Sequence, residues 1–434
     1  MTGCRLPPVT RSLWHHRDFR QLWIAETASH VGTQVVGVAL PVVAVAVLDA
    51  TPLEMGVLTA LETAAFLLIA LPAGAWVDRW RRQRVLVRAD VVRALALVTI
   101  PVAYLLDALT LGQLYLVAAV VGTATVFFDV AYQSYLPSLV DRSQLTDGNG
   151  KLEVSRAVAQ VAGPGLTGVL LRVLAAPLLI VVTAAGYLLS AFFVGRIRHV
   201  DVVPDRSTRR RLRVEIGEGL SFVVRHPLLR RIVACTGTGN LFGSITGTLL
   251  AIYVLRTLGL AESTLGLVLS AGAAGGLLGA FTAARFARVV GEGRTIPLSA
   301  VGFGLFAALT PLAASVEGAA RVVLLVGGSI GVSWAVVVYN VVQVSFRQRL
   351  CPPALLGRMN ASVRFIVFGT MPVGGLLGGV LGTALGVVPA LWVAVAGQLL
   401  AALPVLLSPL LGMRDLPDAL DATSDEAVSP ATPG

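Results

Sequence analysis

Apolar segments long enough to cross a lipid bilayer recur along almost the whole chain, and they constrain its fold more than any other feature. Hydrophobic residues make up 56% of the 434 residues and charged residues only 13%, whereas a soluble domain has roughly 45 to 50% and 25%. A membrane-spanning helix needs about 20 mostly apolar residues, because its backbone groups must bond to one another inside the hydrocarbon. The composition therefore predicts an all-α integral membrane protein.

We expect twelve transmembrane helices in two sets of six. The first set is expected at about residues 19–48, 55–77, 85–106, 112–134, 154–174 and 177–197, and the second at about 228–255, 263–287, 296–315, 320–345, 359–385 and 387–411. These sets define an N-terminal bundle over residues 1–197 and a C-terminal bundle over residues 228–412.

The segments outside the two bundles have different compositions. The linker, residues 198–227, carries a cluster of arginines and then apolar residues at helical spacing, a pattern typical of an amphipathic helix on the membrane surface. Residues 413–434 are acidic and rich in Pro, Ser and Ala, which predicts a disordered cytoplasmic tail.

Arginines supply nearly all of the basic charge, and they lie mainly in alternate loops between the apolar segments. By the positive-inside rule, this distribution places both termini in the cytoplasm and indicates a multi-pass protein of the plasma (inner) membrane. It also argues against a nucleic-acid partner, because the charges act as topology signals. The residues before the first apolar segment lack the apolar core of a signal peptide, so we expect that segment to stay in the membrane.

A weak internal repeat relates the two sets of helices. Arg156 precedes Pro164 by the same number of residues that separates Arg364 from Pro372. Applied to the basic loop Gly74–Arg84, the same offset reaches a second basic loop in the other half. Two parallel six-helix repeats are the simplest explanation, as in transporters built from such repeats.

The loop Gly74–Arg84, with the sequence GAWVDRWRRQR, concentrates charge between two apolar segments. It resembles the signature loop between the second and third helices of the major facilitator superfamily. Gly74, Asp78, Arg79 and Arg82 stand where that motif has Gly, Asp, Arg and Arg, whereas Arg81 replaces its second glycine. Together with the segments RADVVRAL, YLPSLV and GRMNASVR, the loop is similar to the branch of enterobactin and macrolide exporters. The resemblance implies the major facilitator fold.

The resemblance also implies a gate at the cytoplasmic side. Asp78 would face the start of the eleventh helix, where free N–H groups favour an anion, and Arg82 would bridge to Asp129. Arg156 and Arg364 lie near the same helix ends, where they could join these contacts. In the family, such contacts hold the cytoplasmic side shut in the outward-facing state. The alternative is that the arginines, Arg79 included, only anchor the topology.

The fifth predicted helix contains Gly163, Pro164 and Gly168, which resemble the antiporter motif of drug exporters. Glycines let neighbouring helices approach closely, and proline removes one helical hydrogen bond, so that the helix can bend there. The motif favours export. Ordinary close packing of helices is the alternative interpretation.

Two acidic residues are expected deep in the membrane, where a charge costs roughly 2.5 to 3.5 kcal/mol. Glu62 and Glu26 are therefore candidates for proton coupling, with His30 as a third because its unperturbed pKa is near 6.5. Glu26, His30, Thr33 and Gln34 form one polar stripe on the first helix, which we expect to face a central cavity.

Further cavity candidates come from the second half of the chain. They are Asn240, Ser244, Tyr339, Asn340 and Gln343, in addition to Thr33 and Gln34. For each of these, and for the proton-coupling candidates, a hydrogen bond to a neighbouring helix is the alternative role.

These features favour a proton-coupled exporter of a drug-like or siderophore-like small molecule that works by alternating access. The alternatives are a proton-coupled importer, a polytopic membrane enzyme or a sensor. The five histidines and the distant cysteines Cys4, Cys235 and Cys351 form no metal-binding pattern, and no nucleotide-binding loop is present. We therefore expect no metal and no cofactor, the proton gradient as energy source, and, as is usual in the family, a monomer.

Overall fold

The computed structural model describes residues 13–77, 80–140, 144–198, 221–351 and 356–414. In these ranges the chain forms long helices joined by short loops, and no strand occurs among the residues described. Most of the predicted linker and nearly all of the predicted tail lie outside them, so the amphipathic helix and the disordered tail stay predictions.

The helices follow one another in two series. The first consists of η1 (Leu13–His15), α1 (Arg17–Val42) extended by η2 (Val43–Val47), α2 (Pro52–Leu68), α3 (Ala70–Val77), α4 (Arg82–Leu105), α5 (Leu111–Leu139), α6 (Leu145–Leu170) and α7 (Ala176–Gly195). The second consists of α9 (Pro227–Ile252) extended by η5 (Tyr253–Thr257), α10 (Glu262–Val290), α11 (Glu292–Ala307), α12 (Leu309–Leu312), η6 (Ala313–Ser315), α13 (Ala319–Leu350), α14 (Leu356–Leu385), α15 (Val387–Ala401), α16 (Leu403–Leu406) and η7 (Pro409–Leu411).

Nine helical segments in the described ranges are long and apolar enough to cross a membrane. The expected helices at 55–77, 85–106 and 154–174 are not among them. The first is interrupted at Ile69, between α2 and α3, and the second, α4, carries five charged residues in its first twelve positions. Twelve transmembrane helices remain a prediction, in which α2 with α3, α4 and α6 would supply the other three.

The helix α6 begins at Leu145, earlier than the expected start at residue 154. Its additional turns are polar, and the ion pair between Asp147 and Lys151 links two neighbouring side chains there. The Lys151 ammonium also lies 5.7 Å from the centre of the Trp14 ring. Local pairs of this kind extend the helix beyond the apolar segment from which its start was predicted.

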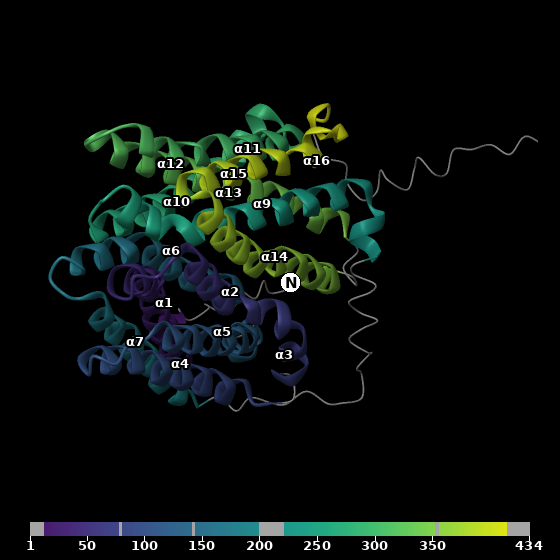
Figure 1. The fold of residues 1–434 in the computed structure, drawn as a ribbon. Helices are drawn as coiled ribbons and strands as arrows, with labels where there is room; N and C mark the ends of the chain where they lie inside the picture. The colour runs from purple at the N-terminus through teal and green to yellow at the C-terminus, as the bar shows by residue number, and fades with distance from the viewer. Residues whose placement is uncertain (1–12, 78–79, 141–143, 199–220, 352–355, 415–434) are drawn as a thin grey trace, which may run out of the picture.

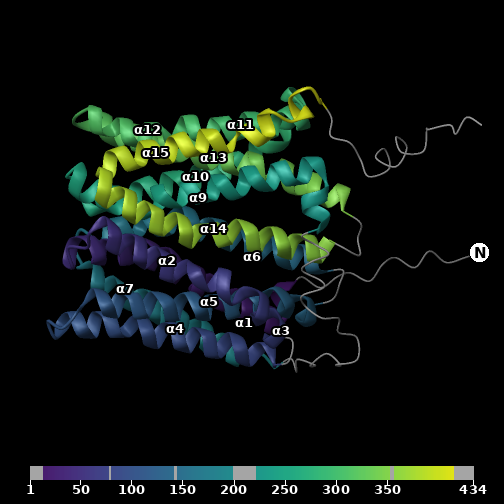
Figure 2. The same ribbon diagram turned by 45° about the vertical axis from the view of Figure 1, so that its right-hand side comes forward.

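The two series form two groups of helices that lie side by side. In Figure 1 the helices α1 to α7, purple to blue, occupy the lower part, and α9 to α16, teal to yellow, the upper part. The groups meet where α2 runs along α14 and α6 runs along α10. The turned view in Figure 2 shows α2 beside α14. We call the end that carries Leu13 and Arg414 the terminal end, and the end that carries the loops 48–51 and 258–261 the loop end.

Small residues allow the two groups to pack closely near the loop end. A Cβ on Gly56 of α2 would lie only 2.8 Å from backbone atoms of Gly375 and Gly379 of α14. On the other side, Ser270 of α10 donates a hydrogen bond to the carbonyl of Val161 in α6, over 2.6 Å. Such contacts between small residues hold helices together in lipid, where water does not drive apolar side chains together.

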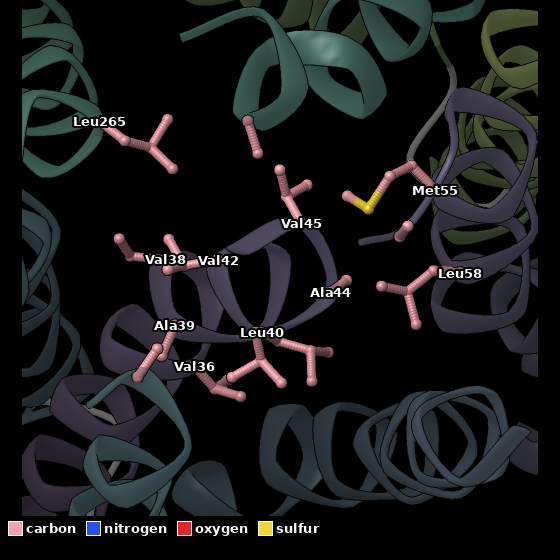
Figure 3. Packing of buried hydrophobic residues seen from close by; sticks show 14 of the residues in the cluster. Val36, Val38, Ala39, Leu40, Val42, Ala44, Val45, Met55, Leu58 and Leu265 are labelled. Carbon is pink, nitrogen blue, oxygen red and sulfur yellow. The ribbon is translucent and has the colours of Figure 1, made fainter. Parts of the chain in front are cut away.

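An apolar cluster fills the space between these contacts. Figure 3 shows Val45 of η2 near Met55 of α2, with Leu265 of α10 on the opposite side. All three side chains are buried in one cluster that includes residues from both helix groups. The loop end is thus packed as a continuous core.

Arg256 adds polar contacts between the groups at the same end. Its guanidinium donates hydrogen bonds to the carbonyl of Ala50, over 2.8 Å, and to Asp49, over 3.0 Å. A third hydrogen bond goes to the carbonyl of Val45. Because Asp49 is exposed, the ion pair itself contributes little. The hydrogen bonds to two carbonyls fix the position of the first helix group relative to the second.

Replacing Gly56 by Val should separate α2 from α14 at the loop end, because the added methyl groups would overlap the backbone of Gly375 and Gly379. We expect the distance between spin labels at Arg172→Cys and Glu317→Cys, one in each helix group, to shift to longer values. Double electron–electron resonance on a chain without its native cysteines measures this distance.

The matched control is Gly327→Val, because a Cβ at Gly327 meets no atom within 4 Å. This variant should leave the distance distribution unchanged. A Gly56→Val protein with the original distribution would show that the close approach does not hold the loop end shut.

Candidate functional site

A cavity of about 660 Å³ lies between the two helix groups. The first group contributes residues from α1 and α2, and the second contributes residues from α9, α11, α13, α14 and α15. Its wall is mainly apolar, with Met55, Phe303, Phe368 and Met371 among the larger side chains. A volume and a lining of this kind are typical of sites for drug-sized molecules.

Glu62 is the one charged side chain among the described residues that line this cavity. It lies on α2, and its side chain is accessible within the cavity rather than packed away. The backbone of Glu62 packs against Gly122 of α5, where a Cβ would not fit. Close packing of α2 against α5 therefore fixes the position from which the carboxyl group enters the cavity.

Four of the predicted cavity residues of the second half also line the cavity. They are Asn240 and Ser244 of α9 and Tyr339 and Asn340 of α13. Part of their hydrogen-bonding capacity is used within the second group: the Ser244 hydroxyl donates to the carbonyl of Met371 over 2.9 Å. The alternative role, an interhelical hydrogen bond, therefore coexists with a place in the cavity wall.

Gln343 lies behind the cavity wall and is not among the residues that line it. Its amide group donates to the side-chain oxygen of Asn340 over 3.1 Å. Tyr339 likewise bonds to the Thr236 hydroxyl over 2.8 Å. These contacts fix the orientation of the polar groups that the cavity presents.

Six hydroxyl- or amide-bearing residues that were not predicted from the sequence also line the cavity: Thr59, Thr63, Thr236, Thr248, Ser299 and Gln398. Three of them are buried, namely Thr248 of α9, Ser299 of α11 and Gln398 of α15. Each has a buried side-chain oxygen with no hydrogen-bond partner among the described residues. Ser299 and Gln398 each stand alone in an apolar segment of the sequence, whereas Thr248 continues the four-residue spacing of Asn240 and Ser244 along α9, a signal that could have found it. A bound molecule with hydrogen-bond donors could satisfy these oxygens.

The polar stripe expected on α1 does not face the cavity as a unit. Thr33 is hydrogen-bonded to the Tyr187 hydroxyl of α7 over 3.0 Å. Gln34 packs against Gly163 of α6, and neither residue is among those that line the cavity. The expectation of one cavity-facing stripe was wrong, because α1 is surrounded by helices on several sides.

The other two residues of the stripe, Glu26 and His30, lie inside the first helix group. Their side chains are 3.3 Å apart, from Nε2 of His30 to a carboxylate oxygen of Glu26. Glu26 is buried, and its second oxygen has no partner among the described residues. The two groups form a separate polar site that does not line the central cavity.

A buried ion pair lies within the same helix group. Asp90 and Arg93, both on α4, are in contact and are at most 2% exposed. The guanidinium of Arg93 lies between two aromatic rings, 4.3 Å from the centre of Phe128 and 4.2 Å from that of Tyr187. Cation–π contacts of this kind stabilise a charge that has been taken out of water. The arrangement connects α4 to α5 and α7.

The predicted gate residues are only partly within the described ranges. Asp78 and Arg79 lie outside them, Gly74 lies in α3, and Arg82 begins α4. The side chain of Arg156 on α6 is half exposed. Its guanidinium Nη1 lies 3.7 Å from a carboxylate oxygen of Glu153 on the same helix. The latch itself therefore stays a prediction.

Asp129 of α5 lies within electrostatic reach of Arg93 and, across the two helix groups, of Arg364 on α14. The guanidinium of Arg364 is also 5.7 Å from the ring of Phe368, which lines the cavity. These charges connect the buried ion pair to the boundary between the groups. The predicted role of Asp129 and Arg364 in a gate is compatible with this placement.

The antiporter-like motif lies at two close helix contacts. Gly163 faces α1, whereas Pro164 and Gly168 face Gly266 of α10. A Cβ on Gly168 would lie 3.1 Å from the Cα of Gly266. The motif therefore provides close packing, both within the first helix group and between the groups.

No group of three or more metal-ligating side chains occurs among the residues described.

The chain matches, over residues 11–429, the model of a protein family described as transmembrane secretion effector. It is 27% identical to the multidrug efflux pump Tap of Mycolicibacterium fortuitum over 354 residues, which is 78% of this chain and 83% of that protein. It is also 24% identical to the enterobactin exporter EntS of Salmonella typhimurium over 349 residues, 80% of this chain and 81% of that protein.

Among solved structures, a bacterial homologue of the iron transporter ferroportin in its inward-facing state has a similar fold. The TM-score is 0.71 at 19% identity, and the match covers 90% of this chain and 98% of that structure. The helical fold and the cavity between two helix groups define a multi-pass membrane transporter. The chain belongs to the transmembrane secretion effector family, within the major facilitator superfamily, and is not an enzyme.

Replacing Arg93 by Met should destabilise the protein by about 3 to 5 kcal/mol, because Asp90 would be left buried without its partner. The double variant Asp90→Asn with Arg93→Met should be less destabilised than Arg93→Met alone. The free energy of unfolding in mixed detergent micelles measures both effects.

Arg88→Met serves as the control, because Arg88 is on the same helix but exposed. Its free energy of unfolding should equal that of the unmodified protein. Equal losses of stability in the single and double variants would contradict the role of the buried ion pair.

Proposed function

We propose that the protein is a proton-coupled exporter of a small, partly apolar molecule that works by alternating access. The observation that carries this proposal is the position of Glu62, a lone carboxyl group in a largely apolar cavity between two helix groups. A charge at this depth is costly, so the site favours either a bound proton or a bound cation. The relatives Tap and EntS, an efflux pump and an exporter by name, support the direction of transport.

Glu62 would couple the two fluxes by competition. When the carboxyl group takes up a proton, its attraction for a substrate with a positive or donor group is lost, and the substrate leaves. When the proton leaves, the carboxylate can again attract substrate. The cavity must therefore open alternately to the two sides, which requires the loop end and the terminal end to close in turn.

Glu26 and His30 would provide a second protonation site. Their distance of 3.3 Å allows one proton to be shared between carboxylate and imidazole. Asp90, Arg93 and Asp129 lie in the same helix group. A proton shared by Glu26 and His30 would therefore alter the electrostatic environment of the ion pair between Asp90 and Arg93. In this proposal Glu26 and His30 sense the proton, and Glu62 contacts the substrate.

The two helix groups are in contact at the loop end. Arg256 and the glycines of α2 and α14 join the helix groups at that end. We propose that the terminal end is cytoplasmic, as the arginine distribution predicts, with both termini inside and the protein in the inner membrane. Asp78 and Arg82 would then form the opposing latch when the terminal end closes.

The cavity wall indicates the chemical class of the substrate. Aromatic and thioether side chains offer an adaptable apolar surface, while Thr248, Ser299 and Gln398 offer oxygens without partners. A drug-like or siderophore-like molecule, with an apolar body and several hydrogen-bond donors, matches both features. We propose that it is carried by a single chain.

The test uses everted membrane vesicles from a host without its own drug pumps. Cargo is first found by growth of that host on a panel of drugs and siderophores. In the vesicles, adding a compound from the panel should dissipate an imposed pH gradient, as reported by acridine orange. Vesicles that keep the gradient with every compound that the protein expels from cells would contradict proton coupling.

Glu62→Gln should abolish the dissipation, a loss of at least about tenfold in rate, because the amide cannot carry the proton. Glu54→Gln is the matched control: Glu54 lies on the same helix, outside the cavity, and glutamine can replace it in the capping box with Thr51. Unchanged gradient-driven efflux in Glu62→Gln would exclude this residue from coupling.

A further inference from the structure

A second large hollow lies on the first helix group, apart from the central cavity. Its volume is about 720 Å³, and it runs between α4 and α5 beside the start of α4. It shares no lining residue with the central cavity among the residues described. In Figure 2, α4 lies at the lower edge of the molecule, on the far side of the first group from α9 to α16. We call this hollow the α4–α5 groove.

Three arginines line one end of the α4–α5 groove. Arg81 directly precedes α4, and Arg84 and Arg88 follow at spacings of about one helical turn, so all three lie on the side of the helix that lines the groove. All three side chains are exposed, and none makes an ion pair with another residue in the described ranges. The positive charge at this end of the groove is therefore available to an external anion.

The rest of the α4–α5 groove is apolar apart from Thr123. Val85, Ala89 and Val92 continue the same side of α4, facing residues of α5 such as Val120 and Phe127. From Arg81 to Val92 the helix rises by about 16 Å, at about 1.5 Å per residue. This length is about half of the roughly 30 Å hydrocarbon thickness, the depth of one leaflet.

The groove opens towards the bilayer and not into the protein. Val92 at its inner end is 44% exposed, and Leu95, one turn further along α4, is 62% exposed. At the charged end, Trp76 stacks on Phe127, with ring centres 6.1 Å apart, and Trp80 lies equally close to the same ring. Tryptophans commonly lie at the level of the lipid headgroups.

We propose that the α4–α5 groove binds an anionic glycerophospholipid, with the phosphate at Arg81, Arg84 and Arg88 and one acyl chain along the apolar wall. Arginine suits this role because its planar guanidinium donates several hydrogen bonds to phosphate oxygens. Basic pockets between membrane helices are known to hold acidic headgroups. The order of features along the groove, with charge at the interface and apolar side chains below it, is that of the lipid itself.

The binding test uses native mass spectrometry of the full chain in detergent, with phosphatidylglycerol and phosphatidylcholine as probes. We expect the protein to retain phosphatidylglycerol preferentially. Each arginine near a headgroup contributes about fivefold in affinity, so Arg84→Gln with Arg88→Gln should weaken phosphatidylglycerol binding about 25-fold. Phosphatidylcholine binding should change little.

The control for charge is Arg285→Gln with Arg288→Gln, which removes two exposed arginines of α10 at the same end of the molecule. This variant should keep the high affinity for phosphatidylglycerol. If the two double variants weakened phosphatidylglycerol binding equally, the proposal would be overturned. That result would show that the lipid responds to the net charge of the protein and not to the α4–α5 groove.

A second variant leaves all arginines in place. Val92→Trp fills the apolar end of the groove and should weaken phosphatidylglycerol binding at least about tenfold, because the acyl chain loses its place. Leu95→Trp, one turn away and outside the groove lining, should not. Full binding by Val92→Trp would also overturn the proposal, since a headgroup contact alone needs no acyl groove.

Discussion

The hydrocarbon of a bilayer cannot form hydrogen bonds, and every other feature of this molecule follows from that constraint. Backbone groups must pair within helices, so the described residues consist of long helices and short loops. Side-chain charges face the same restriction: each must find a partner, reach the interface or enter a cavity. The positions of the charged residues therefore separate those that stabilise the fold from those that are free for function.

The first helix group contains both kinds of charge. The Arg93 guanidinium is paired with Asp90 and lies between two aromatic rings, so it is well placed to join three helices. Glu62 has only the cavity in front of it. The difference has a physical consequence, because a paired charge resists change while a lone carboxyl group can exchange its proton or its partner.

The contact between the helix groups combines weak interactions of different kinds. Glycines let α2 approach α14, an apolar cluster fills the loop end, and Arg256 adds hydrogen bonds to backbone carbonyls. The glycine contacts and the hydrogen bonds of Arg256 run from one group to the other, so they can break without removing a contact inside either group. An interface of this kind is suited to opening and closing. The exposed Arg84 and Arg88 of α4 lie away from it, on the α4–α5 groove.

The sequence by itself determined the class of the protein. Apolar segments of membrane length predicted the helices, and the loop around Gly74 identified the superfamily, because both signals are local. Glu62 was also found from the sequence, since a carboxyl group within an apolar segment is costly wherever it lies. Asn240, Ser244, Tyr339 and Asn340 were predicted as polar cavity residues and line the cavity, whereas Gln343, predicted together with them, does not.

Only the tertiary structure decided which neighbours the polar residues meet. Helical spacing groups Thr33 and Gln34 with Glu26, but α1 has neighbours on several sides, so these residues face different helices. Conversely, Thr248, Ser299 and Gln398 come from three separate helices and converge only when those helices pack. Spacing along a helix fixes the direction of a side chain relative to its own axis, whereas the packing of the helices fixes what lies in that direction.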